Sequence, residues 1–404
     1  PCPQYAWDTP FTFLLSDCIF RRGCLGGRMM IRTLQFETLN GLRGICALLI
    51  ACSHFPAAFL GDQWVLFRNA FVFTNLLFGL SGFVLLNAYQ EKIGTPIQLA
   101  HFIWYRARRL FPVHLFTTLL ILAVPIVSWL LESLVNLLIP GLSPGGLPVQ
   151  TLDMRSFLVH VFLLQGFGLL SQLAYNFPAW SLGAIFYCSL LLGLGLCFSR
   201  RVRIVAFSFV SLGAVFVLLR YAPHYLTSSL DYGIFRALSC FFLGALAAGL
   251  RGHYQTLSPL LKHWMPLIQT LTLMLVLMLA TAVRSDTLMT FVLLPSLTIF
   301  LWVFSYDGTD YSRALQRPVF RWLSARAYSI FMTQALLLFL GAEIQRISAL
   351  LALSPLGSRV AGTVVLLLYL VLLLLLSNWT WLNIEQRFNP KKTCQGYKEI
   401  RINE

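Results

Sequence analysis

Long apolar runs recur along the chain between short polar stretches, without the strict apolar–polar alternation of half-buried strands. Runs such as Leu119 to Val127 and Val364 to Leu376 contain no charged residue. A transmembrane helix needs about 20 mostly apolar residues, and by this criterion the pattern predicts ten spans. Their expected limits are 41–60, 69–89, 112–138, 180–198, 203–220, 233–250, 265–283, 288–304, 328–346 and 358–381. The predicted fold is therefore all-α, a polytopic membrane helix bundle.

Composition supports this class. Of the 404 residues, 58% are hydrophobic and only 11% are charged, against about 25% charged residues in an average globular protein. A single soluble domain of this length could not enclose so many apolar side chains. Disordered and collagen-like proteins are excluded by the same numbers, and the lipid bilayer is the expected partner.

The net charge of +15 reflects topology rather than a nucleic-acid-binding surface. If the N-terminus is cytoplasmic, 22 of the 30 Lys and Arg residues fall in inner segments and seven in outer ones. Lys and Arg concentrate in cytoplasmic loops during insertion, so we expect both termini on the inside. No nucleic-acid partner is expected. We expect a multi-pass protein of the plasma (inner) membrane.

The domain organisation predicted from these spans is simple. Residues 1–38 form an N-terminal cytoplasmic segment whose natural start we expect at Met29 or Met30, residues 39–385 the transmembrane domain, and residues 386–404 a basic cytoplasmic tail. The outer connection 140–179 contains an apolar stretch of about 14 residues, Phe157 to Leu170, which suits an interfacial or re-entrant helix better than a full span.

Nine cysteines show neither the spacing of a metal site nor a paired extracellular cluster. Five of them fall inside predicted spans, where cysteine behaves as a small apolar residue. We expect no disulfide framework and no metal.

Polar residues within a span are costly and therefore informative, and the first span carries two. Arg43 lies near its inner end and His54 lies eleven residues later. At about 100° per residue, the two side chains differ by about 20° around the helix and share a face. With a rise of 1.5 Å per residue, His54 lies about 16 Å deeper than Arg43. Alternatively, an arginine at a helix end is a snorkelling anchor and a single histidine is a packing residue.

The segment that holds this pair, LNGLRGICALLIACSHF from Leu39 to Phe55, resembles the opening signature of the acyltransferase-three family of membrane O-acyltransferases, in which ten residues separate an Arg from a His. The resemblance covers most of the chain from residue 39. Further segments resemble the family's later motifs in the same order: LLFGLSGFVL at 76–85, HFIWYRARRLFPVHL at 101–115, NFPAWSLGAIFY at 176–187, Arg236 with FFLGAL at 241–246, and AYSIFMTQ at 327–334. Ten spans with both termini inside is also the family's arrangement.

Three positions depart from the family's pattern. Asn40 replaces the Asp common before Gly-Leu-Arg, Ile185 replaces the Glu three positions after Trp-Ser-Leu, and Gln334 replaces the His that ends the late Ser-Tyr segment. The missing carboxylate at Ile185 leaves the partner of His54 or of the acceptor unidentified. These three departures indicate either a divergent member of the family or a protein that has lost the activity.

The resemblance implies transfer of an acyl group, with acetyl expected, from cytoplasmic acyl-CoA to a hydroxyl of a carbohydrate or other acceptor. An unperturbed histidine has a pKa of about 6.5, so His54 is suited to act as the general base. Arg43 could contact the pyrophosphate or the thioester. The resemblance assigns the phosphates of CoA to Arg106, Arg108 and Arg109, because arginine binds phosphate bidentately; a positive-inside anchor is the alternative.

Weaker candidates for substrate binding are Trp180, Ser181, Arg236, Tyr328 and Gln334. Trp180 could equally belong to the aromatic belt at a membrane interface. Arg236 could contact an anionic acceptor or be an exception to the topology rule.

Two other function classes fit the same residues. A transporter or flippase would use the charged face of the first span as a polar pathway. A catalytically silent homologue would bind acyl-CoA or lipid without turnover. The enzyme is favoured because Arg43 and His54 are both present.

Overall fold

The structure is a computed structural model that describes residues 36–55, 65–138, 154–173, 175–251, 258–307, 309–350 and 359–388. Within these ranges the chain forms helices and no strands, so the all-α prediction is confirmed. The predicted N-terminal segment and basic tail lie almost entirely outside the described residues. All the helices belong to the unit Phe36–Glu404.

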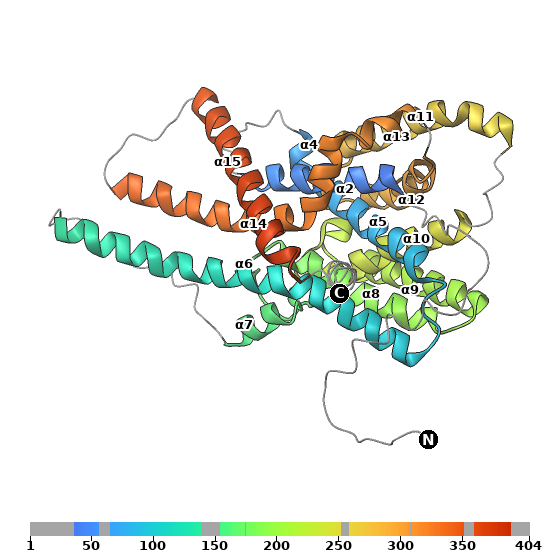
Figure 1. Cartoon of the computed structure of the whole chain (residues 1–404), viewed down its shortest axis with the longest axis horizontal. Coiled ribbons are helices and arrows are strands. Elements are labelled where there is room, and N and C mark those ends of the chain that lie inside the picture. Colours follow the sequence, from blue (N-terminus) through green and yellow to red (C-terminus); the bar gives the residue numbers. More distant parts are fainter. Residues whose placement is uncertain are drawn as a thin grey trace, which may run out of the picture. The chain divides into compact units, whose positions relative to one another are not determined.

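The principal helices follow one another along the chain (Figure 1). They are α2 (Glu37–Ser53), α4 (Val65–Arg68), α5 (Phe71–Tyr89), α6 (Pro96–Leu138), α7 (Met154–Val161), α8 (Ala179–Leu196), α9 (Arg200–Tyr221), α10 (Gly233–Arg251), α11 (Pro259–Ala282), α12 (Leu293–Phe304), α13 (Asp310–Leu315), α14 (Pro318–Leu350) and α15 (Arg359–Thr380). Short 3₁₀ turns are η2 (Gln165–Phe167), η3 (Tyr225–Thr227) and η4 (Leu288–Val292), and the π-helix η5 (Trp381–Glu385) continues α15.

Eight helices in the described ranges are long and apolar enough to cross a membrane, and two shorter apolar helices, Thr38–Ser53 and Leu288–Phe304, accompany them. The protein is therefore a multi-pass membrane protein. These ten segments correspond in order to the ten predicted spans. The number of crossings and the side on which the termini lie remain predictions.

Two helices extend well beyond the predicted spans. The prediction for the third span began at residue 112, but α6 begins at Pro96 and continues through Pro112 and Pro125 for 43 residues. Proline usually breaks a helix, yet neighbouring helices in a membrane can satisfy the freed backbone groups. Similarly, α14 begins at Pro318, ten residues before the predicted start of the ninth span at residue 328.

The outer apolar stretch differs from its prediction in form. A single helix of about 14 residues was expected at 157–170, but α7 has only eight residues and is followed by the turn η2. The stretch nevertheless packs into the bundle, because Leu163 is fully buried against α8. Leu163 and Gly168 adopt positive φ angles of 61° and 71°, which break the helical path on either side of η2.

Helices α2 and α14 run parallel to each other. Near their starts, Ser324 donates a hydrogen bond to the Asn40 carbonyl, and near the end of α2 His54 meets Gln334. Their close approach depends on Gly44, since a Cβ there would lie 2.6 Å from the backbone nitrogen of Ser324. Small residues at such contacts are typical of membrane helix pairs.

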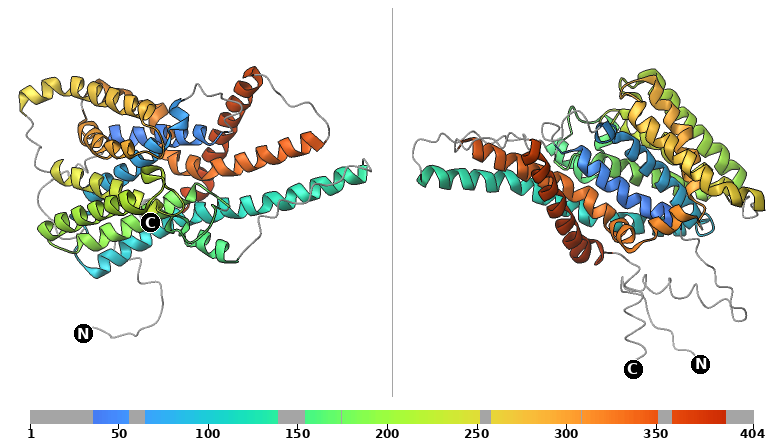
Figure 2. Two further views of the ribbon diagram at one scale, coloured as in Figure 1. Left: turned by 180° about the vertical axis from the view of Figure 1, so that it is seen from behind. Right: turned by 90° about the horizontal axis from the view of Figure 1, so that it is seen from above.

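Helix α6 runs parallel to the same pair. The Tyr328 hydroxyl on α14 donates to the Leu110 carbonyl of α6, and further along Val124 packs against Leu336. Figures 1 and 2 show α6 and α14 extending in the same direction, with α15 crossing α14. Three parallel helices therefore bring the first turns of α2, the arginines of α6 and the first half of α14 to one end of the bundle.

Candidate active site

Three arginines from two helices gather at this end. Arg43 projects from α2, and Arg106 and Arg109 project from the same face of α6, because they are three residues apart. The charges of Arg43 and Arg106 each act on that of Arg109, and those of Arg43 and Arg106 act on each other. The structure thus joins three of the arginines selected from sequence. Arg108 lies on another face of α6, since residues one or two positions apart do not face each other.

Arg106 is the most enclosed member of the cluster. Its side chain is 8% exposed, and its Nε atom is buried without a hydrogen-bond partner. A buried N–H donor without a partner costs about 1–3 kcal/mol. An arginine in this state is suited to receive an anion from outside the protein.

One carboxylate lies close to the arginines. Glu385, the last residue of η5, is 8% exposed, and its charge acts on Arg43, Arg109 and Arg326. Its Oε2 atom accepts a hydrogen bond of 2.8 Å from the Ser329 hydroxyl of α14. The ion pairs found in the described ranges are both elsewhere, so Glu385 approaches the arginines without contacting them within 4.0 Å.

The arginine cluster, defined as Arg43, Arg106 and Arg109, therefore has a net positive charge even with Glu385 beside it. Guanidinium groups match phosphate oxygens bidentately and stay charged at physiological pH. The arrangement fits an anion that carries several phosphate oxygens.

His54 lies at the other end of α2, where it caps the helix. Its Nδ1 lies 3.2 Å from Gln334 Oε1, and Gln334 Nε2 donates to the Phe331 carbonyl at 3.0 Å. Because the Gln334 amide nitrogen is used in that way, its oxygen accepts, and Nδ1 of a neutral His54 carries the proton. The Nε2 atom is then the acceptor. The Phe177 ring packs edge-on against the imidazole, with ring centroids 4.9 Å apart.

His54 and the arginine cluster occupy different levels of the same helix. The eleven residues from Arg43 to His54 correspond to about 16 Å along the axis, and the two side chains share a face of α2. Gln334, at the level of His54, follows Ser329, at the level of Glu385, by five residues on α14. An anion-binding end and an oriented imidazole therefore lie along one row formed by α2 and α14.

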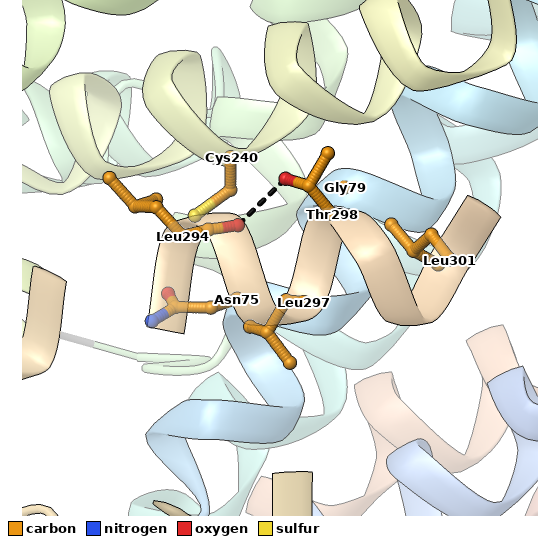
Figure 3. A pocket seen from close by; sticks show the side chains of 7 residues that line it. All are labelled: Asn75, Gly79, Cys240, Leu294, Leu297, Thr298 and Leu301. Atoms are coloured by element: carbon orange, nitrogen blue, oxygen red, sulfur yellow. Dashed lines mark hydrogen bonds between the residues drawn. The ribbon is translucent and has the colours of Figure 1, made fainter. Parts of the chain in front are cut away.

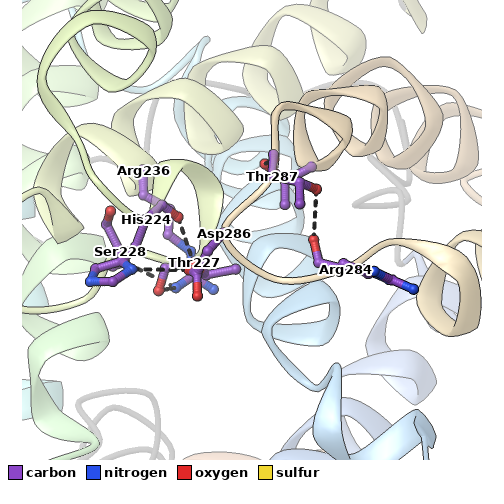
Figure 4. Close-up of polar contacts among 8 residues, drawn as sticks. His224, Thr227, Ser228, Arg236, Arg284, Asp286 and Thr287 are labelled. Carbon is purple, nitrogen blue, oxygen red and sulfur yellow. Dashed lines mark hydrogen bonds and ion pairs between the residues drawn. The ribbon is translucent and has the colours of Figure 1, made fainter.

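Arg236, one of the weaker candidates, lies in a separate polar group with Thr227 and Ser228 (Figure 4). Arg236 is 2% exposed and donates to Asn75 Oδ1 at 2.6 Å and to the carbonyls of Phe71, Thr227 and Ser228. Trp180 covers the Arg236 guanidinium at 5.3 Å. Arg236 is thus occupied by oxygen atoms of the protein itself, and it joins α5, η3 and α10.

Two other candidates are also held by nearby backbone atoms. Ser181 is 3% exposed and donates to the Pro178 carbonyl at 3.1 Å, and Tyr328 donates to Leu110 as described above. Ile185, which stands in place of the family's Glu, packs partly buried against the main core. Of the five weak candidates, Gln334 alone contacts His54 in the described structure.

Two buried histidines that the sequence analysis did not select lie between α6 and the outer connection. His160 Nδ1 accepts from Gln165 Nε2 at 2.7 Å, His160 Nε2 lies 3.0 Å from the Thr118 hydroxyl, and His114 Nε2 donates to the His160 carbonyl. Burial, followed by the nearby His114, lowers the pKa of His160 to about 3. His160 is therefore neutral at physiological pH and serves as a hydrogen-bonding group.

A small cavity between α5, α10 and α12 is lined by Asn75, Cys240, Thr298 and neighbouring apolar residues (Figure 3). Its volume of about 10 Å³ is at the limit for one water molecule. It is too small for an acyl chain or a sugar.

Glu385, Ser329 and Phe177 are parts of the site that were not predicted from the sequence. Glu385 follows the last apolar run, where an acid is usually the polar end of a span, and its meeting with α2 and α6 depends on tertiary structure. The available sequence signal was that Glu385 is an acidic residue directly before the basic C-terminal tail. Phe177 lies in a quoted motif, but an aromatic residue near a span end has many other uses.

Comparison with known sequences identifies the family. The profile of the acyltransferase-three family, described as an acyltransferase domain, matches residues 36–386, from the start of α2 to just past Glu385. The chain belongs to the acyltransferase-three family. A protein of Rhizobium radiobacter named "Protein 2 in picA locus" is 32% identical over 152 residues, 37% of this chain and 75% of that protein. No solved structure matches the chain. Membership makes the protein a membrane acyltransferase and agrees with the helical bundle.

Proposed function

We propose that the protein transfers an acyl group, with acetyl expected, from cytoplasmic acyl-CoA to a hydroxyl of a carbohydrate or other acceptor at the plasma (inner) membrane. The observation that carries the proposal is the row on α2 and α14. It combines three arginines without direct carboxylate partners at one level with His54, oriented by Gln334, at another.

The arginine cluster supplies the binding half of the activity. The phosphates of acyl-CoA are oxygen-rich anions that can pair with Arg43, Arg106 and Arg109, which have no carboxylate in direct contact among the described residues. The buried Arg106 Nε supports this use because it has a free donor. The pantetheine arm separates the phosphates from the thioester, so a ligand held at the arginines can extend along α2 towards His54.

The chemical half uses the free nitrogen of His54. His54 Nε2 takes the proton of the acceptor hydroxyl while the hydroxyl oxygen attacks the thioester carbonyl carbon. The carbon–sulfur bond then breaks, and the proton passes to the departing thiolate to give CoA and an ester. Gln334 keeps the imidazole in the required tautomer, as the orienting partner does in other histidine bases.

The direct test uses the full chain in lipid nanodiscs with acetyl-CoA labelled in the acetyl group. We expect CoA thiol to appear only when a hydroxyl acceptor is present, with one equivalent of label on the acceptor for each thiol. A panel of polyols and glycans identifies the acceptor. Binding of acetyl-CoA without thiol release from any acceptor would favour a silent homologue. Solute movement without acetyl-CoA consumption would favour a transporter.

A further inference from the structure

Glu385 has no role in the reaction described above, although it is a buried carboxylate next to the proposed phosphate site. Glu385 is hydrogen-bonded to Ser329, and the neighbouring Tyr328 bonds to the Leu110 carbonyl next to Arg109, yet neither Arg43 nor Arg109 forms an ion pair with Glu385. Opposite charges attract each other, so a neighbouring group must hold the carboxylate away from the two cations.

The Ser329 hydroxyl holds the carboxylate in place. Ser329 is fully buried on α14 and donates to Glu385 Oε2 at 2.8 Å. The backbone at Ser329 is in turn tied to Thr333, which bonds to Ser377 of α15. The carboxylate is thus fixed to α14 and α15, rather than to the helices that carry the arginine cluster.

The fourth nearby cation, Arg326, is already committed. Its Nε donates to Asn378 Oδ1 at 2.7 Å, and its guanidinium lies between the rings of Trp322 and Trp381, 4.1 Å from each centroid. This stacking anchors the start of η5. Arg326 therefore fixes the position of η5 and its last residue Glu385, but it does not neutralise the Glu385 carboxylate, whose charge can act on the arginine cluster.

We propose that Glu385 belongs to the acyl-CoA site as the acidic residue that limits the affinity for CoA phosphates, and that Ser329 is the positioning residue that keeps it off the arginines. This inference rests on the proposed function. A carboxylate held at this position repels an anion bound at the arginine cluster, so it lowers the affinity for that anion without preventing its binding. The consequence is faster release of CoA after transfer, and release of product often limits turnover.

The test measures CoA affinity of the full chain by calorimetry. Glu385→Gln removes the charge and should tighten CoA binding about tenfold, which corresponds to about 1.4 kcal/mol. Ser329→Ala leaves the charge but frees it to pair with Arg43 or Arg109, so it should weaken CoA binding severalfold. The double variant should match Glu385→Gln, because Ser329 acts through the carboxylate. Glu91→Gln, which removes an exposed acid elsewhere, should change nothing.

Stopped-flow measurements complete the test. Glu385→Gln should show a normal first turnover and a slower steady state, since CoA leaves more slowly. Affinity that is unchanged or weaker in a folded Glu385→Gln protein would overturn the inference while leaving the proposed function intact. If that variant does not fold, Ser329→Ala decides, and unchanged or tighter binding there overturns the inference. Absence of CoA binding by the wild-type protein would overturn both proposals.

Discussion

Replacing Gln334 by leucine removes the oxygen that accepts the His54 Nδ1 proton while keeping a side chain of similar length. The lost hydrogen bond, 3.2 Å in the structure, is worth about 1–1.5 kcal/mol. If this hydrogen bond is fully present in the transition state, its loss lowers kcat about tenfold. If His54 also loses the tautomer with the proton on Nδ1, the decrease can reach about 100-fold. The KM for acyl-CoA should stay constant, because Gln334 lies away from the arginine cluster.

The assay for this prediction is acceptor-dependent release of CoA thiol, measured at saturating acetyl-CoA. Gln334→His provides the matched control, because a neutral imidazole also offers an acceptor nitrogen and the family usually has His at this position. We expect that variant to keep most of the activity. A folded Gln334→Leu protein with wild-type kcat would refute the idea that Gln334 orients His54.

Three other substitutions separate binding from stability. Arg106→Ala and Arg109→Ala should each weaken acyl-CoA binding by about 1.5–3 kcal/mol in calorimetry. Lys at either position should restore only part of the affinity, because it lacks the bidentate fork of arginine. Unchanged affinity in both alanine variants would show that the phosphates bind elsewhere. Arg236→Ala should destabilise the fold by about 3–5 kcal/mol, seen as a lower Tm in detergent, because it removes four hydrogen bonds made by a buried guanidinium. A loss of activity at unchanged Tm would instead indicate that Arg236 contacts the acceptor.

The apolar runs were sufficient to predict the helical class and the order of the helices, because the bilayer requires each crossing segment to satisfy its own backbone. They did not predict the length of α6. Pro112 and Pro125 suggested helix ends, but the helix continues through both. The irregular form of the outer connection around η2 was also beyond the sequence, since it depends on the fit of Leu163 against α8.

For the candidate site, too, some features could be predicted from the sequence and others depended on tertiary packing. A shared helix face can be read from spacing, so Arg43 and His54 could be paired from the first span alone. The meeting of Arg43 with Arg106 required the parallel packing of α2, α6 and α14. The partners Gln334 and Glu385 lie 280 and 342 residues from the α2 side chains they accompany. No local pattern reports contacts over such separations.

The most direct measurement is the rate of acceptor-dependent CoA release by His54→Gln in nanodiscs, after insertion, monodispersity and CoA affinity have been shown to match the wild-type protein. Glutamine keeps hydrogen bonding at this position but cannot take a proton at neutral pH. If His54 is the general base, turnover falls about 10²–10⁴-fold while CoA affinity is retained. Release of CoA by His54→Gln at the wild-type rate would contradict the catalytic assignment of His54.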